Sequence, residues 1–95
     1  MLIDKGLTEG DVVSIKLISG EEIIARFESE SSIEVKISKP LCVTLGPQGL
    51  GMIPWVFLGE KDTVPVKKEH VMVMMLSKKE ASDQYVQGTT GIALR

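Results

Sequence analysis

Apolar and polar residues alternate in the first third of the chain in the pattern of half-buried β-strands. Residues 13–17 read Val-Ser-Ile-Lys-Leu, and an apolar run returns at residues 23–27 after Ser19-Gly20-Glu21. In a strand, a pattern that repeats every two residues directs successive side chains to opposite faces. Because the connecting segment is a short turn, we expect the two strands to pair as an antiparallel hairpin.

A longer alternating segment follows the polar residues 28–32. Apolar side chains occupy every second position over residues 33–37 and again over residues 41–45, with Pro40 between the two stretches. Proline lacks the N–H group that a strand ladder needs, so it interrupts the pattern locally. We therefore predict one long strand over residues 33–45, bent near the proline.

The second half of the chain predicts two more strand regions. Residues 46–51 have the composition of a turn, and the apolar run at residues 52–58 contains a proline, which favours an edge or bulged strand. Residues 64–76 form the last strand region. The total is about five short strands, which suggests a small barrel or a bent sheet because rolling the sheet hides its unpaired edges.

A short helix is predicted to follow the last strand. Ser77-Lys78-Lys79-Glu80 fits a capping box, in which serine and glutamate satisfy free backbone N–H groups. The helix would carry Ala81 and Tyr85 on one face and end near Gly88. The chain thus divides into a β-domain at residues 1–76 and a C-terminal helix and tail at residues 77–95.

Composition favours a single folded domain that has no strong attraction to nucleic acid as a whole. The 95 residues are 43% apolar and 25% charged, and 11 basic against 13 acidic residues give a net charge of −2. A lone cysteine, Cys42, excludes an internal disulfide and favours a reducing compartment, so we expect a cytoplasmic protein. No apolar stretch is long enough to span a membrane.

Few residues suggest a catalytic, metal-binding or phosphate-binding site. His70 is the only histidine and has no further ligands at metal-binding spacing, so we predict no metal and no cofactor. We also predict no enzyme, because a nucleophile, a base and an orienting group do not occur together. Lys67-Lys68 is a basic pair that could bind phosphate if repeated around a ring, or could simply protect a strand edge from aggregation.

Two segments resemble the two halves of the Sm motif. In residues 13–25, an alternating strand leads to the turn glycine Gly20 and then to a small residue, Ala25. Residues 66–71 resemble the second half, where the family carries an apolar residue followed by Arg or Lys. With the C-terminal helix, the chain looks most like the small Sm-like proteins, of LSm and Hfq type, of T4-type phages and cyanophages.

The resemblance implies a fold and an assembly. The expected fold is mostly β, a strongly bent five-stranded antiparallel open barrel with a short C-terminal helix. It also implies a homo-oligomeric ring of about five to seven subunits, a closed cyclic assembly. We expect edge pairing between residues 52–58 of one subunit and residues 64–76 of the next.

The resemblance further implies binding of single-stranded, U-rich or A-rich RNA in RNA metabolism or regulation. Sm-like proteins use Asp and Asn in the loop after the second strand and Arg-Gly in the last loop. Here Ser32 lies nearest the asparagine position, Lys67 takes the arginine position and Lys68 replaces the glycine. The expected site comprises Ser31, Ser32, Lys67, Lys68 and His70. The alternative is a protein-only oligomeric scaffold or interaction module of a phage.

Overall fold

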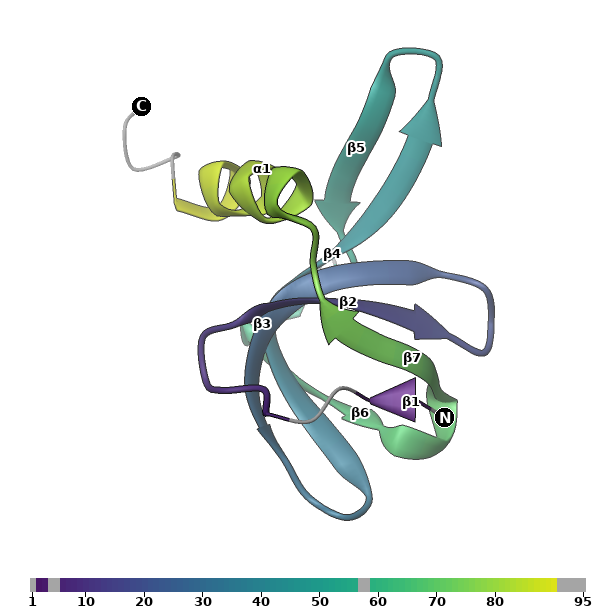
Figure 1. Ribbon diagram of the computed structural model, residues 1–95, viewed down its shortest axis with the longest axis vertical. Coiled ribbons are helices and arrows are strands. Elements are labelled where there is room, and N and C mark those ends of the chain that lie inside the picture. The colour runs from purple at the N-terminus through teal and green to yellow at the C-terminus, as the bar shows by residue number, and fades with distance from the viewer. Residues whose placement is uncertain (1, 4–5, 57–58, 91–95) are drawn as a thin grey trace.

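The computed structural model describes residues 2–3, 6–56 and 59–90, which form one β-sheet and one α-helix (Figure 1). In these residues a 3₁₀ turn, η1 (Lys68–His70), connects the last two strands, and α1 (Lys79–Thr90) follows them. All strand pairs are antiparallel except a two-residue parallel pair between the first and last strands. The prediction of a mostly β, antiparallel open sheet with one short C-terminal helix is confirmed. The strands are β1 (Leu2–Ile3), β2 (Val12–Leu17), β3 (Glu22–Glu30), β4 (Glu34–Gly46), β5 (Gly49–Pro54), β6 (Thr63–Lys67) and β7 (Val71–Leu76).

The strand order forces the sheet to roll. The order is β1-β7-β2-β3-β4-β5, and β6 pairs with the first part of β4. Strands β7 and β6 therefore lie at opposite ends of the series β7-β2-β3-β4-β6, which in a flat sheet would hold them about 19 Å apart. The four peptide links from Lys67 to Val71 reach at most roughly 14 Å. The sheet must curl until these two strands approach each other, as Figure 1 shows.

Two apolar clusters occupy the two faces of this sheet. The main cluster fills the inside of the roll, and a smaller cluster lies on the outside, beneath α1. Neighbouring residues such as Ile23 and Ile24 contribute to different clusters because successive side chains of a strand point to opposite faces. Buried members of the main cluster include Val13, Ile15, Leu17, Ile23, Phe27, Val35, Ile37, Val66, Val71 and Met74.

Tyr85 fixes α1 on the outer face of the sheet. Its side chain is 0% exposed and packs with Val12 and Ile24. Its hydroxyl group donates to the carbonyl oxygens of Ser38 and Lys39, at 3.1 and 2.8 Å. Lys39 has a φ of 49° at the bend of β4, so the helix binds the backbone where the strand turns. The predicted bend before Pro40 and the predicted helix face of Ala81 and Tyr85 are both confirmed.

Alkaline pH is expected to weaken the fold through Tyr85. Burial raises the pKa of Tyr85 to about 12, and the carboxylates of Asp62 and Glu28 add to this while Arg26 opposes it. Between about pH 10 and pH 12 the unfolded chain loses this proton while the folded chain keeps it, so stability falls as pH rises through this window. We expect a loss of roughly 1 to 2 kcal/mol after solvent screening.

The comparison is with Tyr85→Phe, which has no phenolic proton. Both proteins are unfolded by denaturant at about pH 9 and about pH 12. Because they share every other titrating group, the difference between them isolates the contribution of Tyr85 to stability. The stability advantage of the wild-type protein over Tyr85→Phe should shrink at the higher pH. An advantage that stays constant would contradict the raised pKa.

Several strand predictions need correction. The described residues contain seven strands, not about five, because Leu2–Ile3 adds a short strand and the region 64–76 splits into β6 and β7 around the charged η1 turn. Strand β5 begins at Gly49, earlier than predicted, since the turn needs only Pro47 and Gln48. Residues 57–58 of the predicted strand lie outside the described residues.

The ends of two other elements also differ from the prediction. Ile33 is 70% exposed and lies in a turn, not in the strand that begins at Glu34. Ser77 follows β7 but remains hydrogen-bonded to the sheet, with its N–H bonded to the carbonyl oxygen of Val12 and its hydroxyl 2.8 Å from that of Ser14, so α1 begins later, at Lys79. The helix passes the predicted end at Gly88 and includes Thr89 and Thr90, while residues 91–95 of the predicted tail lie outside the described residues.

Candidate functional site

Four of the five residues predicted to bind RNA, Ser31, Ser32, Lys67 and Lys68, lie where the β3–β4 turn meets η1. The pairing of β4 with β6 sets Glu34 opposite Lys67, and the N–H of Lys68 donates to the carbonyl oxygen of Ile33 at 2.8 Å. A hollow of about 400 Å³ lies between the two segments. Its lining residues are Ser32, Ile33, Glu34, Lys67, Lys68 and Glu69.

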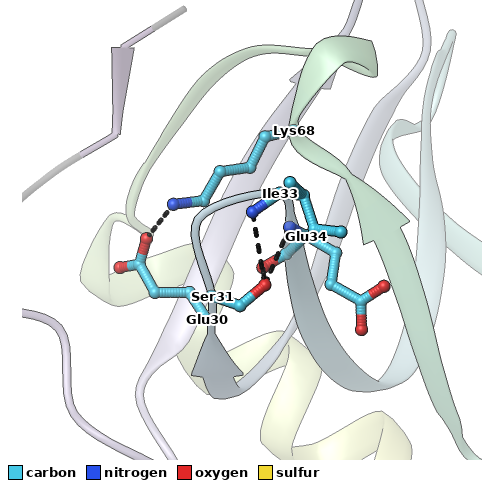
Figure 2. Close-up of polar contacts among 5 residues, drawn as sticks. All are labelled: Glu30, Ser31, Ile33, Glu34 and Lys68. Carbon is cyan, nitrogen blue, oxygen red and sulfur yellow. Dashed lines mark hydrogen bonds and ion pairs between the residues drawn. The ribbon is translucent and has the colours of Figure 1, made fainter.

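Ser31 shapes the turn beside this hollow. Its hydroxyl oxygen accepts the N–H groups of Ile33 and Glu34, at 3.3 and 3.2 Å (Figure 2). Its own N–H donates to the carbonyl oxygen of Glu34 at 2.9 Å. A serine that bonds nearby backbone groups in this way stabilises a tight turn. Ser31 therefore positions the loop, whereas Ser32 is exposed and lines the hollow.

The two lysines of the hollow have different electrostatic surroundings. The ammonium group of Lys68 lies 2.7 Å from Oε2 of Glu30, and the Lys68 side chain is only 17% exposed (Figure 2). Lys67 is exposed at the end of β6. An ion pair this close offsets most of the attraction that Lys68 could offer to a phosphate group.

Acidic residues outnumber basic residues around this hollow. Glu34 and Glu69 line it, and Glu30 lies at its edge through the contact with Lys68. These three carboxylates face two ammonium groups, so the local charge is negative. The three glutamates could not be predicted as part of this site, because only the β4–β6 register and the turn at Ser31 bring them to the lysines.

His70 lies apart from the other predicted site residues. It lines a second hollow, of about 380 Å³, formed with Trp55, Glu21 and Ile18 among others. There the indole N–H of Trp55 donates to Oε2 of Glu21 at 3.1 Å, and the nearest carboxylate oxygen to His70 is that of Glu69, at 3.9 Å. The structure thus places Ser32, Lys67 and Lys68 together and His70 on another surface. No sequence signal could have linked Trp55 to Glu21 across 34 positions.

Three further features of the chain bear on its function. In the described part of the chain, no three His, Cys, Asp or Glu side chains lie close enough together to hold a metal ion. The helix within the described residues is too short and too polar to cross a membrane. No known protein family matches the chain, and no curated protein matches it either.

Proposed function

We propose that this chain is an Sm-like protein that acts as a protein assembly module. One observation carries the proposal: β6 and β7 are joined by the short η1 turn although they end the series β7-β2-β3-β4-β6 on opposite sides. Five strands in a strongly bent sheet are what the sequence resemblance implies. The two segments that resemble the Sm motif fall on the β2–β3 hairpin and on the β6–η1–β7 corner, which supports the same identity.

Copies of the chain would associate through the outer edges of β6 and β7. Among the described pairings, β6 has a partner on one side only, and the outer side of β7 meets β1 only at Val73 and Met74. Unpaired N–H and C=O groups at a strand edge can pair with a strand of another molecule. Both edges lie within residues 63–76, so the proposed pairing is of β6 with β7. Residues 52–54 of the segment predicted to pair with residues 64–76 belong to β5, which forms a hairpin with the end of β4.

The charge of the Ser32 hollow favours a protein-only module over RNA binding. Lys68 is paired with Glu30, and the carboxylates of Glu34 and Glu69 would repel a phosphate group at the same place. RNA binding is the second candidate function. The observation that favours it is the convergence of Ser32, Lys67 and Lys68 on one hollow.

The test measures the mass of the protein in solution and its binding to RNA. Native mass spectrometry and sedimentation should give a single closed assembly, a ring of roughly five to seven copies or a pair of such rings. Labelled U-rich and A-rich RNAs should show no salt-sensitive binding, even at low salt. A monomer at all concentrations would contradict the assembly proposal.

A matched pair of variants decides between the two candidate functions. If RNA does bind, Lys67→Ala/Lys68→Ala should abolish the binding when the Ser32 hollow is the site. The control, Lys78→Ala/Lys79→Ala, removes the same charge from the start of α1, where Lys79 pairs with Asp83. If RNA binds to the wild-type protein and only Lys67→Ala/Lys68→Ala loses the binding, the RNA-binding proposal replaces the protein-only one.

A further inference from the structure

A β-hairpin projects from the rolled sheet beside α1 (Figure 1). We call it the arm; it comprises residues 41–54, the end of β4 and all of β5. Its register pairs Leu41 with Pro54 at the base and Gly46 with Gly49 at the tip. Because directly paired residues point to the same side of a sheet, one face of the arm is apolar along its length. That face carries Leu41, Val43, Leu45, Leu50, Met52 and Pro54.

The arm lies within a long uncharged stretch of the chain. None of the twenty residues from Pro40 to Gly59 is charged, although charged residues make up 25% of the whole sequence. Near the tip, Leu45 is 83% exposed and Leu50 is 41% exposed. Solvent-exposed edge strands usually carry charges that prevent association, and apolar exposed surfaces mark interaction sites. The arm lacks that protection.

The arm is held above a hollow in the body of the protein. Its base packs against the cluster of Tyr85, and the side-chain amide of Gln84 donates to the carbonyl oxygen of Leu50 at 3.1 Å. These contacts fix the arm relative to α1 without covering its tip. The hollow measures about 350 Å³, and the arm itself forms part of its wall. Its apolar lining comprises Ile24, Val43, Leu50, Met52, Met75, Leu76 and Ala81, and its polar lining comprises Ser14, Glu22 and Lys78.

We propose that the arm is a self-association element: two copies of this chain place their arms face to face, and each arm tip fills the hollow of the other copy. The apolar character of the arm tip and of the hollow favours a second copy of the chain as the occupant. Most of the wall of the hollow is apolar, and a charged segment would lose hydration against it. The tip of a second copy brings uncharged Leu45 and Leu50 instead, and a two-fold contact lets each copy both insert and receive.

The size of the arm favours insertion over a flat contact. Six residues per strand span about 20 Å, and two strands are about 10 Å wide, so a flat arm-to-arm contact covers only about 200 Å² on each copy. Stable interfaces cover about 800 Å² on each partner. Insertion adds the walls of the hollow and its rim at Met75 and Leu76 to the area that is buried. A two-fold pair of copies contains two such insertions. Met75 and Leu76 lie at the end of β7, but insertion uses their side chains and not the backbone edge of the strand, so it does not depend on the proposed ring.

The first test is the mass of Leu45→Glu/Leu50→Glu relative to the wild-type protein. Both side chains are exposed, so the variant should keep its circular dichroism spectrum while losing the arm contact. We expect its mass to be half that of the wild type, measured by sedimentation over about a hundredfold range of concentration. A paired ring would become a single ring and a dimer would become a monomer. An unchanged mass would overturn the proposal.

The control for this test changes two exposed isoleucines outside the arm. Ile18→Glu/Ile33→Glu introduces the same charges at residues that are 59% and 70% exposed. This variant should keep the wild-type mass. A mass halved in the control as well would overturn the assignment to the arm. The test stays valid if the protein forms no ring, because the mass of each variant is compared with that of the assembly that the wild-type protein forms.

A cross-linking experiment places the arm directly on its partner. In a Cys42→Ser background, Leu45→Cys and Met75→Cys are made in separate proteins, one of them carrying a mass tag, and the two are mixed. A short bismaleimide should join the tagged to the untagged chain, because residue 45 of one copy meets the rim at residue 75 of the other. Ile33→Cys in place of Met75→Cys should give no such product. Absence of the 45–75 product would overturn the proposed insertion.

Discussion

Replacing Tyr85 with alanine is expected to lower the free energy of unfolding by about 3 to 5 kcal/mol, the range for removing a large buried aromatic side chain. Tyr85 is 0% exposed and joins α1 to Val12 and Ile24 of the sheet. The stability of a small domain is only about 5 to 15 kcal/mol, so this loss is a large fraction of the total. Denaturant unfolding measures it, and hydrogen exchange of the α1 amides should show the helix released first.

The control for this prediction is Tyr85→Phe, which keeps the ring and removes only the hydroxyl group. It loses the bonds to the carbonyl oxygens of Ser38 and Lys39, and we expect a cost of about 1 kcal/mol. If phenylalanine costs as much as alanine, the hydrogen bonds at the bend of β4 hold the helix, not the packing. A cost below about 1 kcal/mol for alanine would contradict the role of Tyr85 as the anchor of α1.

Replacing Ile37 with alanine should cost about 2 to 5 kcal/mol. Ile37 is 0% exposed and lies in β4 between Phe27 of β3 and Val64 of β6. Removing its side chain leaves a cavity at the strand that holds β6 in the roll, so the effect combines lost burial with lost packing. Thermal or denaturant unfolding at neutral pH measures the change.

Ile33 offers a matched control four residues earlier in the chain. It is the same residue type and is 70% exposed, so Ile33→Ala should change the stability by less than about 0.5 kcal/mol. Alternation in the sequence gives these two isoleucines the same expected environment. Equal costs for the two variants would show that Ile33 is buried in solution and would contradict the turn at Ser31.

The difference between Ile33 and Ile37 shows where sequence periodicity reaches its limit. The alternation around Ile15 and Ile37 correctly predicted buried faces, because period-two burial is a local property of a strand. The end of a strand depends on competing hydrogen bonds. The hydroxyl of Ser31 takes the N–H groups of Ile33 and Glu34, and that contact turns the chain before the strand begins.

The same limit applies to the candidate site. The sequence identified Ser32, Lys67 and Lys68 as a group, and the structure brings all three to one hollow. The ion pair of Glu30 with Lys68 could not be predicted from the sequence, since 38 positions separate the two residues. That ion pair, more than the presence of the lysines, decides which function the site favours.

The sequence by itself determined the strand-rich character of this protein, the main hairpin, the bend near Pro40 and the buried face of the C-terminal helix. Each of these depends on the spacing of side chains along a short segment, where a regular backbone fixes the direction of every residue. Only the tertiary structure decided the rolled strand order, the ion pair of Lys68 with Glu30, the separation of His70 and the arm beside its hollow. These features depend on register between distant strands, and register is set by the packing of the whole sheet.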